Sequence, residues 1–379
     1  MLHVALITTS YPEHTPGTEA AGSFVEDFAR ELSRHVRVTV VAASAAESLS
    51  VDGLLRVQRF AVPRLPLSLL NPIVPMHWIP IMKTIRAGDY ALENLAQADR
   101  PDYVLALWAL PSGYWANKAA NRHGFKYSIW ALGSDIWTLG KVPLVRNILR
   151  GILKRADRRY ADGIQLAHDV EVICGLRCGF LPSTRRLPRI SRPEKARQAP
   201  YKLAFLGRWH RNKGTDLLLD ALGLLTDSDW NRITELRLFG GGPLRDYVHS
   251  AVDALQAQGR PVTVGGYLDK DAAAELIGWA DYLLLPSRIE SIPVIFSDAM
   301  QLQTPLISTP VGDLPRLFEK HQVGVLATKA AAQEFAKAIQ QGLSEDVTSF
   351  SEAINLASKE FDLPSIVRDF VAHLECPEK

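Results

Sequence analysis

The chain has 379 residues, more than one typical domain, so two domains are expected. A hydrophobic content of 47%, a charged content of 22% and a net charge of +2 fit an ordinary soluble globular protein and give no reason to expect a nucleic-acid partner. Three cysteines form no even disulfide framework, which favours a reducing compartment and hence the cytoplasm.

Strands and helices alternate along the first half of the chain. The N-terminal apolar run lacks a basic leader region and turns polar at Thr8, so it predicts a strand and not a signal peptide. Alternation of this kind is typical of a parallel sheet covered by helices. Strands are predicted in this half, in chain order, at 4–8, 36–42, 102–108, 127–131 and 162–167.

A loop at 9–23 joins the first strand to a helix whose apolar face is marked by Phe24, Phe28 and Leu32. The loop has no Gly-x-Gly-x-x-Gly pattern, so a bound dinucleotide is not indicated. Gly22 comes directly before the helix, whose N-terminus is a candidate anion site. The alternative is a tight turn that requires glycine only for packing.

Two later stretches of this half could touch a membrane. Residues 61–82 are apolar, but their prolines exclude a transmembrane helix, which leaves a membrane flap, a loop beside a ligand or a connection packed on the core. Residues 141–160 carry an apolar stripe, with Arg146, Arg150 and Lys154 on another face. They predict either a basic amphipathic helix on the inner face of an anionic membrane or a solvated helix packed on a core.

A proline-rich, basic stretch at 181–200 predicts an interdomain linker. The second half then opens with a strand, a loop bounded by Gly207 and Gly214, and a helix. Arg208 and Lys213 lie inside that loop. A guanidinium and an ammonium at a helix N-terminus suit a doubly charged anion, and the alternative is a pair of solvated loop cations.

The stretch that begins with the predicted strand at 282–285 is the most specific in the chain. A short polar loop carries Glu290, and Pro293 suits the first turn of the helix that follows. Ligands of parallel sheets lie beyond the carboxyl ends of the strands, so a carboxylate beside backbone N–H groups here suits a ligand with several hydroxyls. The strands predicted for this half are 202–206, 236–239, 262–264, 282–285 and 305–308.

The sequence ESIPVIFSDAM at 290–300, followed by TPLI at 304–307, resembles the donor site of retaining group 1 glycosyltransferases. Their signature is Glu, seven residues, Glu. A second match is the phrase Gly-Arg, four residues, Lys-Gly at 207–214. The resemblance implies an α/β protein of GT-B architecture, with two Rossmann-like domains facing a central cleft.

The domain bounds expected from this resemblance place an N-terminal, acceptor-side domain at 1–180. A returning C-terminal helix at 361–379 would join that domain. The linker at 181–200 would lead into a nucleotide-sugar-binding domain at 201–360.

The activity implied is retaining transfer of a sugar from a nucleotide-diphosphate donor to a glycan or glycolipid hydroxyl, with no metal or other cofactor. Glu290 would hold the sugar hydroxyls and favour the cationic sugar that develops, while Arg208 and Lys213 would hold the diphosphate. Trp108 and Asp135 are implied on the acceptor side, and the alternative for Asp135 is capping of the next helix. The donor-binding residues implied are Gly22, Gly207, Gly241, Gly242, Pro243, Tyr267, Leu268, Ser291, Ile292, Pro293, Val294 and Asp298.

Two positions depart from the family pattern. Leu132 stands where the family has a histidine that helps to bind the transferred sugar, and Asp298 replaces the second glutamate, whose implied partner is the ribose. Two other functions therefore stay open: a non-catalytic or partner-dependent nucleotide-sugar-binding subunit, and an epimerase or phosphorylase on the same architecture. Asp227 and Asp229 have the spacing of a metal-binding pair but lie in a predicted polar surface loop, so no metal site is predicted.

Overall fold

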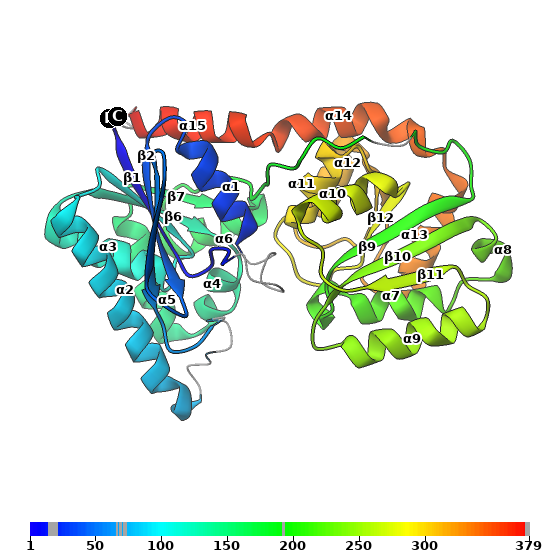
Figure 1. The fold of residues 1–379 in the computed structure, drawn as a ribbon, viewed down its shortest axis with the longest axis horizontal. Coiled ribbons are helices and arrows are strands. Elements are labelled where there is room, and N and C mark those ends of the chain that lie inside the picture. Colours follow the sequence, from blue (N-terminus) through cyan, green and yellow to red (C-terminus); the bar gives the residue numbers. More distant parts are fainter. Residues whose placement is uncertain (14–21, 66, 68–69, 71–73, 192–193, 376–379) are drawn as a thin grey trace. The chain divides into compact units, whose positions relative to one another are not determined.

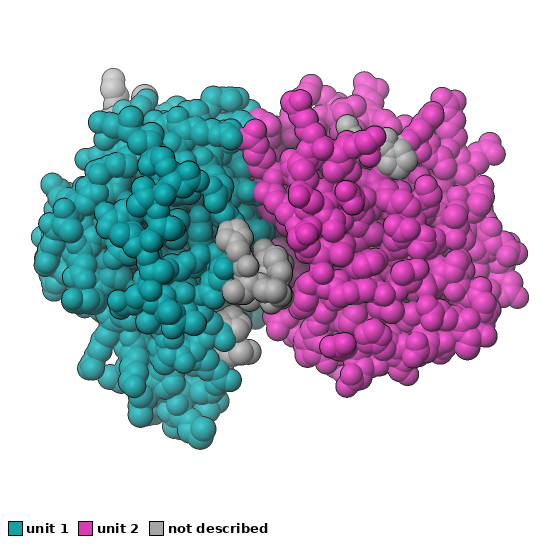
Figure 2. All heavy atoms as spheres, viewed as in Figure 1, with its two compact units in different colours: residues 1–183, 363–379 teal, residues 184–362 magenta. Residues whose placement is uncertain are grey.

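The structure is a computed structural model that describes residues 1–13, 22–65, 67, 70, 74–191 and 194–375. The chain separates into two compact units (Figure 2). Unit 1 comprises Met1–Ser183 with Leu363–Lys379, and unit 2 comprises Thr184–Asp362. Each unit is a β-sheet with helices packed on it (Figure 1), so the predicted α/β fold class is confirmed.

Unit 1 is built on an eight-stranded sheet in the order β3-β4-β2-β1-β5-β6-β7-β8. Neighbouring strands are parallel, except that β3 and β4 pair antiparallel. The strand order reverses between β1 and β5, and ligands of such sheets bind at this reversal. The strands are β1 (His3–Thr8), β2 (Arg37–Ser44), β3 (Ser48–Asp52), β4 (Leu55–Ala61), β5 (Tyr103–Leu107), β6 (Lys126–Ala131), β7 (Arg158–Ala161) and β8 (Gly179–Phe180).

Helices cover both faces of this sheet, as parallel strands require. α1 and α15 contribute to one core, and α2, α3, α5 and α6 contribute to the core on the other face (Figure 1). Among the described helices, none joins sufficient length to sufficient hydropathy to cross a membrane. The helices are α1 (Ser23–Leu32), α2 (Trp78–Ala98), α3 (Ser112–His123), α4 (Ser134–Trp137), α5 (Pro143–Arg155), α6 (Ile164–Cys174) and α15 (Leu363–Glu375), with short 3-10 helices at Pro75–His77 and Leu139–Lys141.

The strand predicted at 162–167 is wrong. The strand is β7, four residues earlier in the chain, and α6 already begins at Ile164. Leu166, Val170 and Ile173 are buried at helical spacing, so the apolar run belongs to the inner face of a helix. β7 begins with two arginines, so its sequence lacks the apolar pattern of a buried strand. In the structure the Arg159 guanidinium donates to two carbonyls near the end of α5.

The last helix, α15, belongs to unit 1 although the chain reaches it from unit 2. The ring of Phe370 lies 5.5 Å from that of Phe28 and 5.8 Å from that of Tyr160, measured between centroids. The helix falls within the segment predicted to return, 361–379, of which residues 376–379 are outside the described residues.

Unit 2 holds a six-stranded parallel sheet in the order β11-β10-β9-β12-β13-β14. Its strand order reverses between β9 and β12, which is where a doubly wound sheet binds its ligand. The strands are β9 (Tyr201–Arg208), β10 (Ile233–Gly241), β11 (Val262–Gly265), β12 (Tyr282–Leu285), β13 (Leu306–Ser308) and β14 (Gly324–Leu326). The helices are α7 (Thr215–Leu222), α8 (Asp227–Trp230), α9 (Arg245–Ala257), α10 (Lys270–Trp279), α11 (Val294–Gln301), α12 (Leu314–His321), α13 (Ala332–Ser344) and α14 (Ser351–Glu360), with 3-10 helices at Arg211–Lys213 and Val347–Phe350.

The segment predicted as a linker, 181–200, does not lie free between the units. From Thr184 onward it is part of unit 2. The Lys195 ammonium donates to the Gly278 carbonyl at 3.0 Å, and Leu187 and Ile190 pack against the core of this unit. The segment lacks regular structure in its described residues, but two of its basic side chains, Arg185 and Lys195, bind other parts of unit 2, while Arg189 is exposed.

Candidate active site

The candidate site lies at the strand reversal of unit 2, where the loops after β9 and β12 meet. Gly214 ends the β9 loop in a left-handed conformation, with φ 68°, and a Cβ atom there would lie 1.8 Å from the Pro286 carbonyl oxygen. No other residue fits at this distance. The Arg288 guanidinium also ties the loops together, donating to the Arg211 carbonyl and to Asp216, each at 2.7 Å.

This meeting of loops brings Lys213 and Glu290 into direct contact. The Lys213 ammonium and the Glu290 carboxylate form an ion pair through Oε1. The Ser287 hydroxyl donates to the same oxygen at 3.1 Å. The other carboxylate oxygen of Glu290 makes no hydrogen bond with another described residue, so one oxygen is fixed and one is left for a ligand.

Arg208 adds a second cation at the end of β9. Its side chain is exposed, and within the described part of the chain it has no hydrogen-bond or ion-pair partner. Arg208 and Lys213 therefore lie on one loop ahead of α7, whose N-terminus carries a partial positive charge. This arrangement can bind a diphosphate, and the predicted association of Arg208, Lys213 and Glu290 at one sheet edge agrees with the geometry.

The remaining predicted donor residues of unit 2 follow neighbouring strand ends. The Tyr267 hydroxyl donates to the Gly241 carbonyl at 2.8 Å, and the Trp209 backbone N–H donates to that carbonyl at the same distance. These contacts join the loops after β9, β10 and β11 into one surface. Gly207, Gly241, Gly242, Pro243, Tyr267 and Leu268 all lie at or just after the ends of these strands.

The turn from Glu290 into α11 is largely buried. Ile292 packs in the core, so only its backbone could reach a ligand, and Pro293 precedes the first residue of the helix, Val294. The Ser291 hydroxyl is buried and lacks a hydrogen-bond partner among the described residues. A buried hydroxyl of this kind is costly unless a ligand or water satisfies it, which favours Ser291 as a ligand contact.

Asp298, the predicted ribose contact, lies in the interior of unit 2. Asp298 is on α11 with 0% of its surface exposed, and its carboxylate pairs with the Arg185 guanidinium. An interior carboxylate needs a cation, and here the cation comes from the segment that the sequence suggested was a linker. In this structure Asp298 is therefore held by Arg185, and its contact with a ribose stays a prediction.

Asp135 in unit 1 is also buried. It is 1% exposed, and its carboxylate accepts hydrogen bonds from the backbone N–H groups of Ala109, at 2.6 Å, and of Leu132, at 3.3 Å. These bonds join the loops that follow β5 and β6. The carboxylate also accepts from the backbone N–H groups of Asp135 and Ile136 in the first turn of α4, which agrees with the capping alternative. The role of Asp135 on the acceptor side stays a prediction.

The other unit 1 predictions fall near the strand reversal between β1 and β5. Gly22 has φ 77°, and a Cβ atom there would lie 2.5 Å from the Ser10 carbonyl oxygen, so packing alone requires glycine. Anion binding by Gly22 stays a prediction, and positions 14–21 of its loop lie outside the described residues. Trp108 follows β5 in a left-handed conformation, with φ 69°, and stays a candidate on the acceptor side. Leu132 packs its side chain on the core.

Exchanging Asp135 for asparagine should lower the unfolding free energy of unit 1 and remove a pH dependence of that free energy. Burial raises the pKa of the Asp135 carboxyl to about 6, although backbone N–H donors oppose the shift. The folded state then holds the proton more tightly than the unfolded state. The stabilisation is greatest at low pH and is lost as the pH rises through about 6. Relative to Asp135→Asn, the wild type should therefore gain about 1 kcal/mol of unfolding free energy between about pH 7 and about pH 5. Urea unfolding of both proteins at each pH measures this difference, and a pH-independent difference would contradict it.

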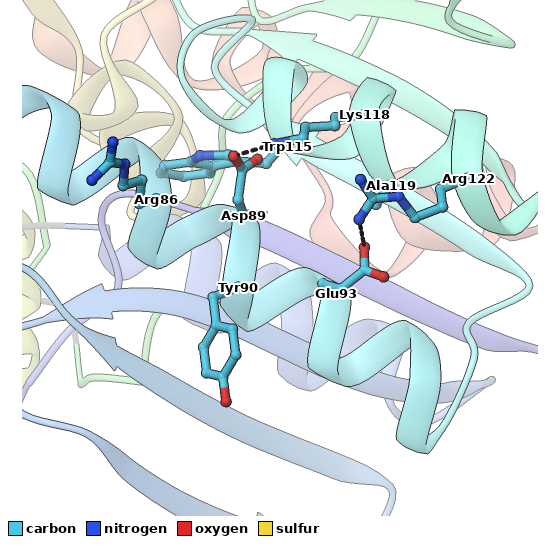
Figure 3. Close-up of a pocket in the computed structure, with 8 residues that line it drawn as sticks. All are labelled: Arg86, Asp89, Tyr90, Glu93, Trp115, Lys118, Ala119 and Arg122. Carbon is cyan, nitrogen blue, oxygen red and sulfur yellow. Dashed lines mark hydrogen bonds and ion pairs between the residues drawn. The ribbon is translucent and has the colours of Figure 1, made fainter.

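No metal site is found among the described residues, which contain no group of three histidine, cysteine or acidic side chains arranged to hold an ion. Asp227 pairs with Arg260, and Asp229 accepts hydrogen bonds from Thr226 and Gln340. A cavity of about 260 Å³ lies in unit 1 between α2 and α3 (Figure 3). Its charged residues are mostly paired with one another, and it contains no predicted site residue.

Three contributing residues were missed by the sequence analysis: Ser287, Arg288 and Arg185. Ser287 and Arg288 stand directly after a predicted strand, so their position was a usable signal for a role in the site. Arg185 offered no such signal, because its partner is on a distant helix.

Comparison with known proteins matches most of unit 2 to a family. A family model described as "Glycosyl transferases group 1" matches residues 200–345. The chain is 26% identical over 280 residues to the putative teichuronic acid biosynthesis glycosyltransferase TuaC of Bacillus subtilis, an alignment that covers 69% of this chain and 67% of TuaC. It is 28% identical over 174 residues to D-inositol 3-phosphate glycosyltransferase of Corynebacterium aurimucosum, which covers 44% of this chain and 41% of that enzyme.

Solved structures extend the likeness to both units. Sucrose-phosphate synthase of Thermosynechococcus elongatus superposes with a TM-score of 0.75 at 17% identity, covering 99% of this chain and 98% of that one. Anabaena HepE, solved in complex with UDP-glucose, gives a TM-score of 0.68 at 15% identity, covering 99% of this chain and 100% of that one. At such low identity the likeness establishes the fold, which is GT-B as predicted.

Proposed function

We propose that this chain acts as a group 1 glycosyltransferase with the GT-B fold. It moves a sugar from a nucleotide-diphosphate donor to an acceptor hydroxyl, with retention at the anomeric carbon. The observation that carries the proposal is the contact between Lys213 and Glu290 at the strand reversal of unit 2. It combines one group for a sugar and one for a phosphate at the place where a doubly wound sheet binds its ligand.

The leaving diphosphate is the group that requires stabilisation. As the bond to the anomeric carbon breaks, negative charge develops on the phosphate oxygens, and Arg208, Lys213 and the N-terminus of α7 supply positive potential. Removal of one preorganised donor from such a site costs about 3 kcal/mol of transition-state stabilisation. This charge comes from the protein, so we propose that no metal ion is needed.

Glu290 acts on the sugar side. Its Oε1 is held by Lys213 and Ser287, which fixes the carboxylate, while the second oxygen accepts hydrogen bonds from sugar hydroxyls. The negative charge also favours the cationic sugar that develops during transfer. The Ser291 hydroxyl, which has no partner among the described residues, supports a further hydrogen bond to the same ligand.

The donor and the acceptor are suggested by the relatives. HepE was solved with UDP-glucose, and a trehalose-6-phosphate enzyme of E. coli was solved with UDP-2-fluoro glucose, so a UDP-sugar is the first donor to test. The name of TuaC refers to teichuronic acid biosynthesis, which supports an acceptor in polysaccharide or glycolipid assembly. A location at the cytoplasmic face of a membrane is a further part of the proposal.

Contact of residues 141–160 with that membrane is part of the proposal but is supported by few side chains. On α5, Leu149, Ile152 and Leu153 are buried. Several of the basic side chains are used within unit 1, since Arg150 donates to the Ile173 carbonyl. The exposed apolar side chains Val142, Leu144 and Ile148, with the exposed Lys141 and Lys154, are left to meet a membrane.

A thermal-shift screen against UDP, GDP, ADP and dTDP sugars tests the donor site, first without metal and then with magnesium. A donor present at a hundred times its Kd should raise the unfolding free energy by about 2.7 kcal/mol. A shift with one donor, followed by transfer that keeps the anomeric configuration in an NMR assay, is the expected result.

Two outcomes would contradict the proposal. A shift without transfer to any acceptor would favour the non-catalytic binding subunit, a function that Leu132 in place of the family histidine supports. The absence of any shift would remove the donor site itself.

A further inference from the structure

The first half of α2 in unit 1 exposes an unusual set of apolar side chains. Met76, just before the helix, is 84% exposed, and Trp78, Ile79 and Met82 are 56%, 67% and 53% exposed. A cluster of large exposed apolar side chains often marks an interaction site, whereas single scattered ones do not. Together with Lys83 and Arg86 we call this surface the α2 face.

The α2 face is confined to the N-terminal end of the helix. The C-terminal half buries Ala91, Leu92 and Leu95 against the sheet and exposes the polar Gln97. In Figure 1 the N-terminal end of α2 projects beyond the strands of unit 1, and in Figure 2 the same end forms a protrusion of that unit. The exposed apolar side chains are therefore carried on a protruding tip and not in a groove.

The charge of the α2 face is positive. Lys83 and Arg86 are exposed, and in the described ranges neither has a hydrogen-bond or ion-pair partner. The sequence contains no aspartate or glutamate between Asp52 and Asp89, while it contains basic residues throughout that interval. A partner of this face is therefore apolar at its centre and negatively charged around it.

We propose that the α2 face docks unit 1 onto an anionic phospholipid bilayer. Aliphatic and aromatic side chains on a protruding helix end can enter the boundary between headgroups and acyl chains, where tryptophan is favoured. Lys83 and Arg86 lie on the same side of the helix and reach lipid phosphates with their long side chains. The inference concerns unit 1 alone and does not depend on the donor or on sugar transfer.

Two other exposed apolar surfaces of unit 1 lack this combination. Leu49 and Val51 on β3 are exposed, but the exposed Asp52 follows them directly and would be repelled by anionic lipid. Val142, Leu144 and Ile148 at α5 are exposed too and have the exposed Lys141 and Lys154 near them, but they include no aromatic side chain, and Arg146 and Arg150 are bonded to backbone carbonyls of unit 1. The α2 face joins exposed apolar side chains that include a tryptophan to two cations that have no partner among the described residues.

Flotation with lipid vesicles tests the proposal. The full chain is mixed with vesicles of phosphatidylcholine containing phosphatidylglycerol, and separately with vesicles of phosphatidylcholine alone. The wild type should float with the first kind, and added salt should weaken the binding. Two double variants should each reduce the bound fraction by about tenfold or more. One is Ile79→Ser with Met82→Ser, and the other is Lys83→Glu with Arg86→Glu.

Matched controls remove equally exposed apolar side chains elsewhere on unit 1. Leu49→Ser with Val51→Ser should bind vesicles as the wild type does. Circular dichroism and thermal unfolding should show that every variant is folded, since all the substituted side chains are on the surface.

Several outcomes would overturn the inference. Wild-type protein that ignores anionic vesicles, or α2 variants that bind them normally, would remove the α2 face as a lipid surface. Loss of binding in Leu144→Ser with Ile148→Ser, while the α2 variants bind, would assign the contact to α5. A second copy of the chain is the other possible partner of this face, and light scattering after gel filtration tests it. If the wild type is a dimer and the Ile79→Ser, Met82→Ser variant is a monomer, the α2 face is an interface between two copies.

Discussion

The Glu290→Gln variant should transfer sugar about 100- to 1,000-fold more slowly than the wild type while it still binds the donor. Glutamine keeps the size of the side chain and can still accept a hydrogen bond from Lys213, so the loop retains its shape. It removes the negative charge that favours the cationic sugar as the diphosphate leaves. Initial rates with the donor identified by thermal shift measure kcat, and the same shift measures donor binding.

The matched control for this variant is Glu319→Gln. Glu319 is an exposed glutamate on α12 in the same unit, outside the loops that form the site. It should transfer sugar at the wild-type rate. If Glu290→Gln also transfers at that rate, Glu290 has no part in the reaction. If it loses the donor-induced shift together with transfer, the role of Glu290 is in binding and not in the transition state.

The contact between Lys213 and Glu290 could be anticipated because both residues follow strands of a parallel sheet. Glycines, cations and a carboxylate placed directly after apolar runs are visible in the sequence, and the carboxyl ends of parallel strands share one edge. The sequence did not reveal that β9 and β12 are neighbours at the strand reversal. That order depends on which helices cover which face, and no local pattern contains this information.

Burial was the property that the sequence predicted least well. Asp135 follows a strand and Asp298 stands at the second acidic position of the family signature, so both look like ligand-binding acids, yet both are interior. Each has a partner remote in sequence, the Ala109 backbone for Asp135 and Arg185 for Asp298, and Asp135 also accepts from the nearby Leu132 backbone. A carboxylate can be interior or exposed depending on such partners, so its role could be assigned only after the fold placed them.

Replacing Arg185 with methionine should lower the unfolding free energy of the protein by about 3–5 kcal/mol, because it leaves the Asp298 carboxylate buried without its cation. Urea unfolding followed by circular dichroism measures the loss. Arg189→Met is the matched control, since Arg189 is an exposed arginine of the same segment and should change little. An Arg185→Met variant as stable as this control would contradict the structural role of the pair.

The double variant Arg185→Met with Asp298→Leu distinguishes a structural pair from a ribose site. Apolar side chains that replace both partners of a buried ion pair often restore stability, so the double variant should recover most of the loss. Donor affinity is the second measurement. If Asp298 faces only Arg185, the double variant should bind the nucleotide sugar with wild-type affinity. Recovered stability with lost donor binding would instead show that the carboxylate turns toward the ribose when the donor is present, and that Arg185 holds it only in the absence of ligand.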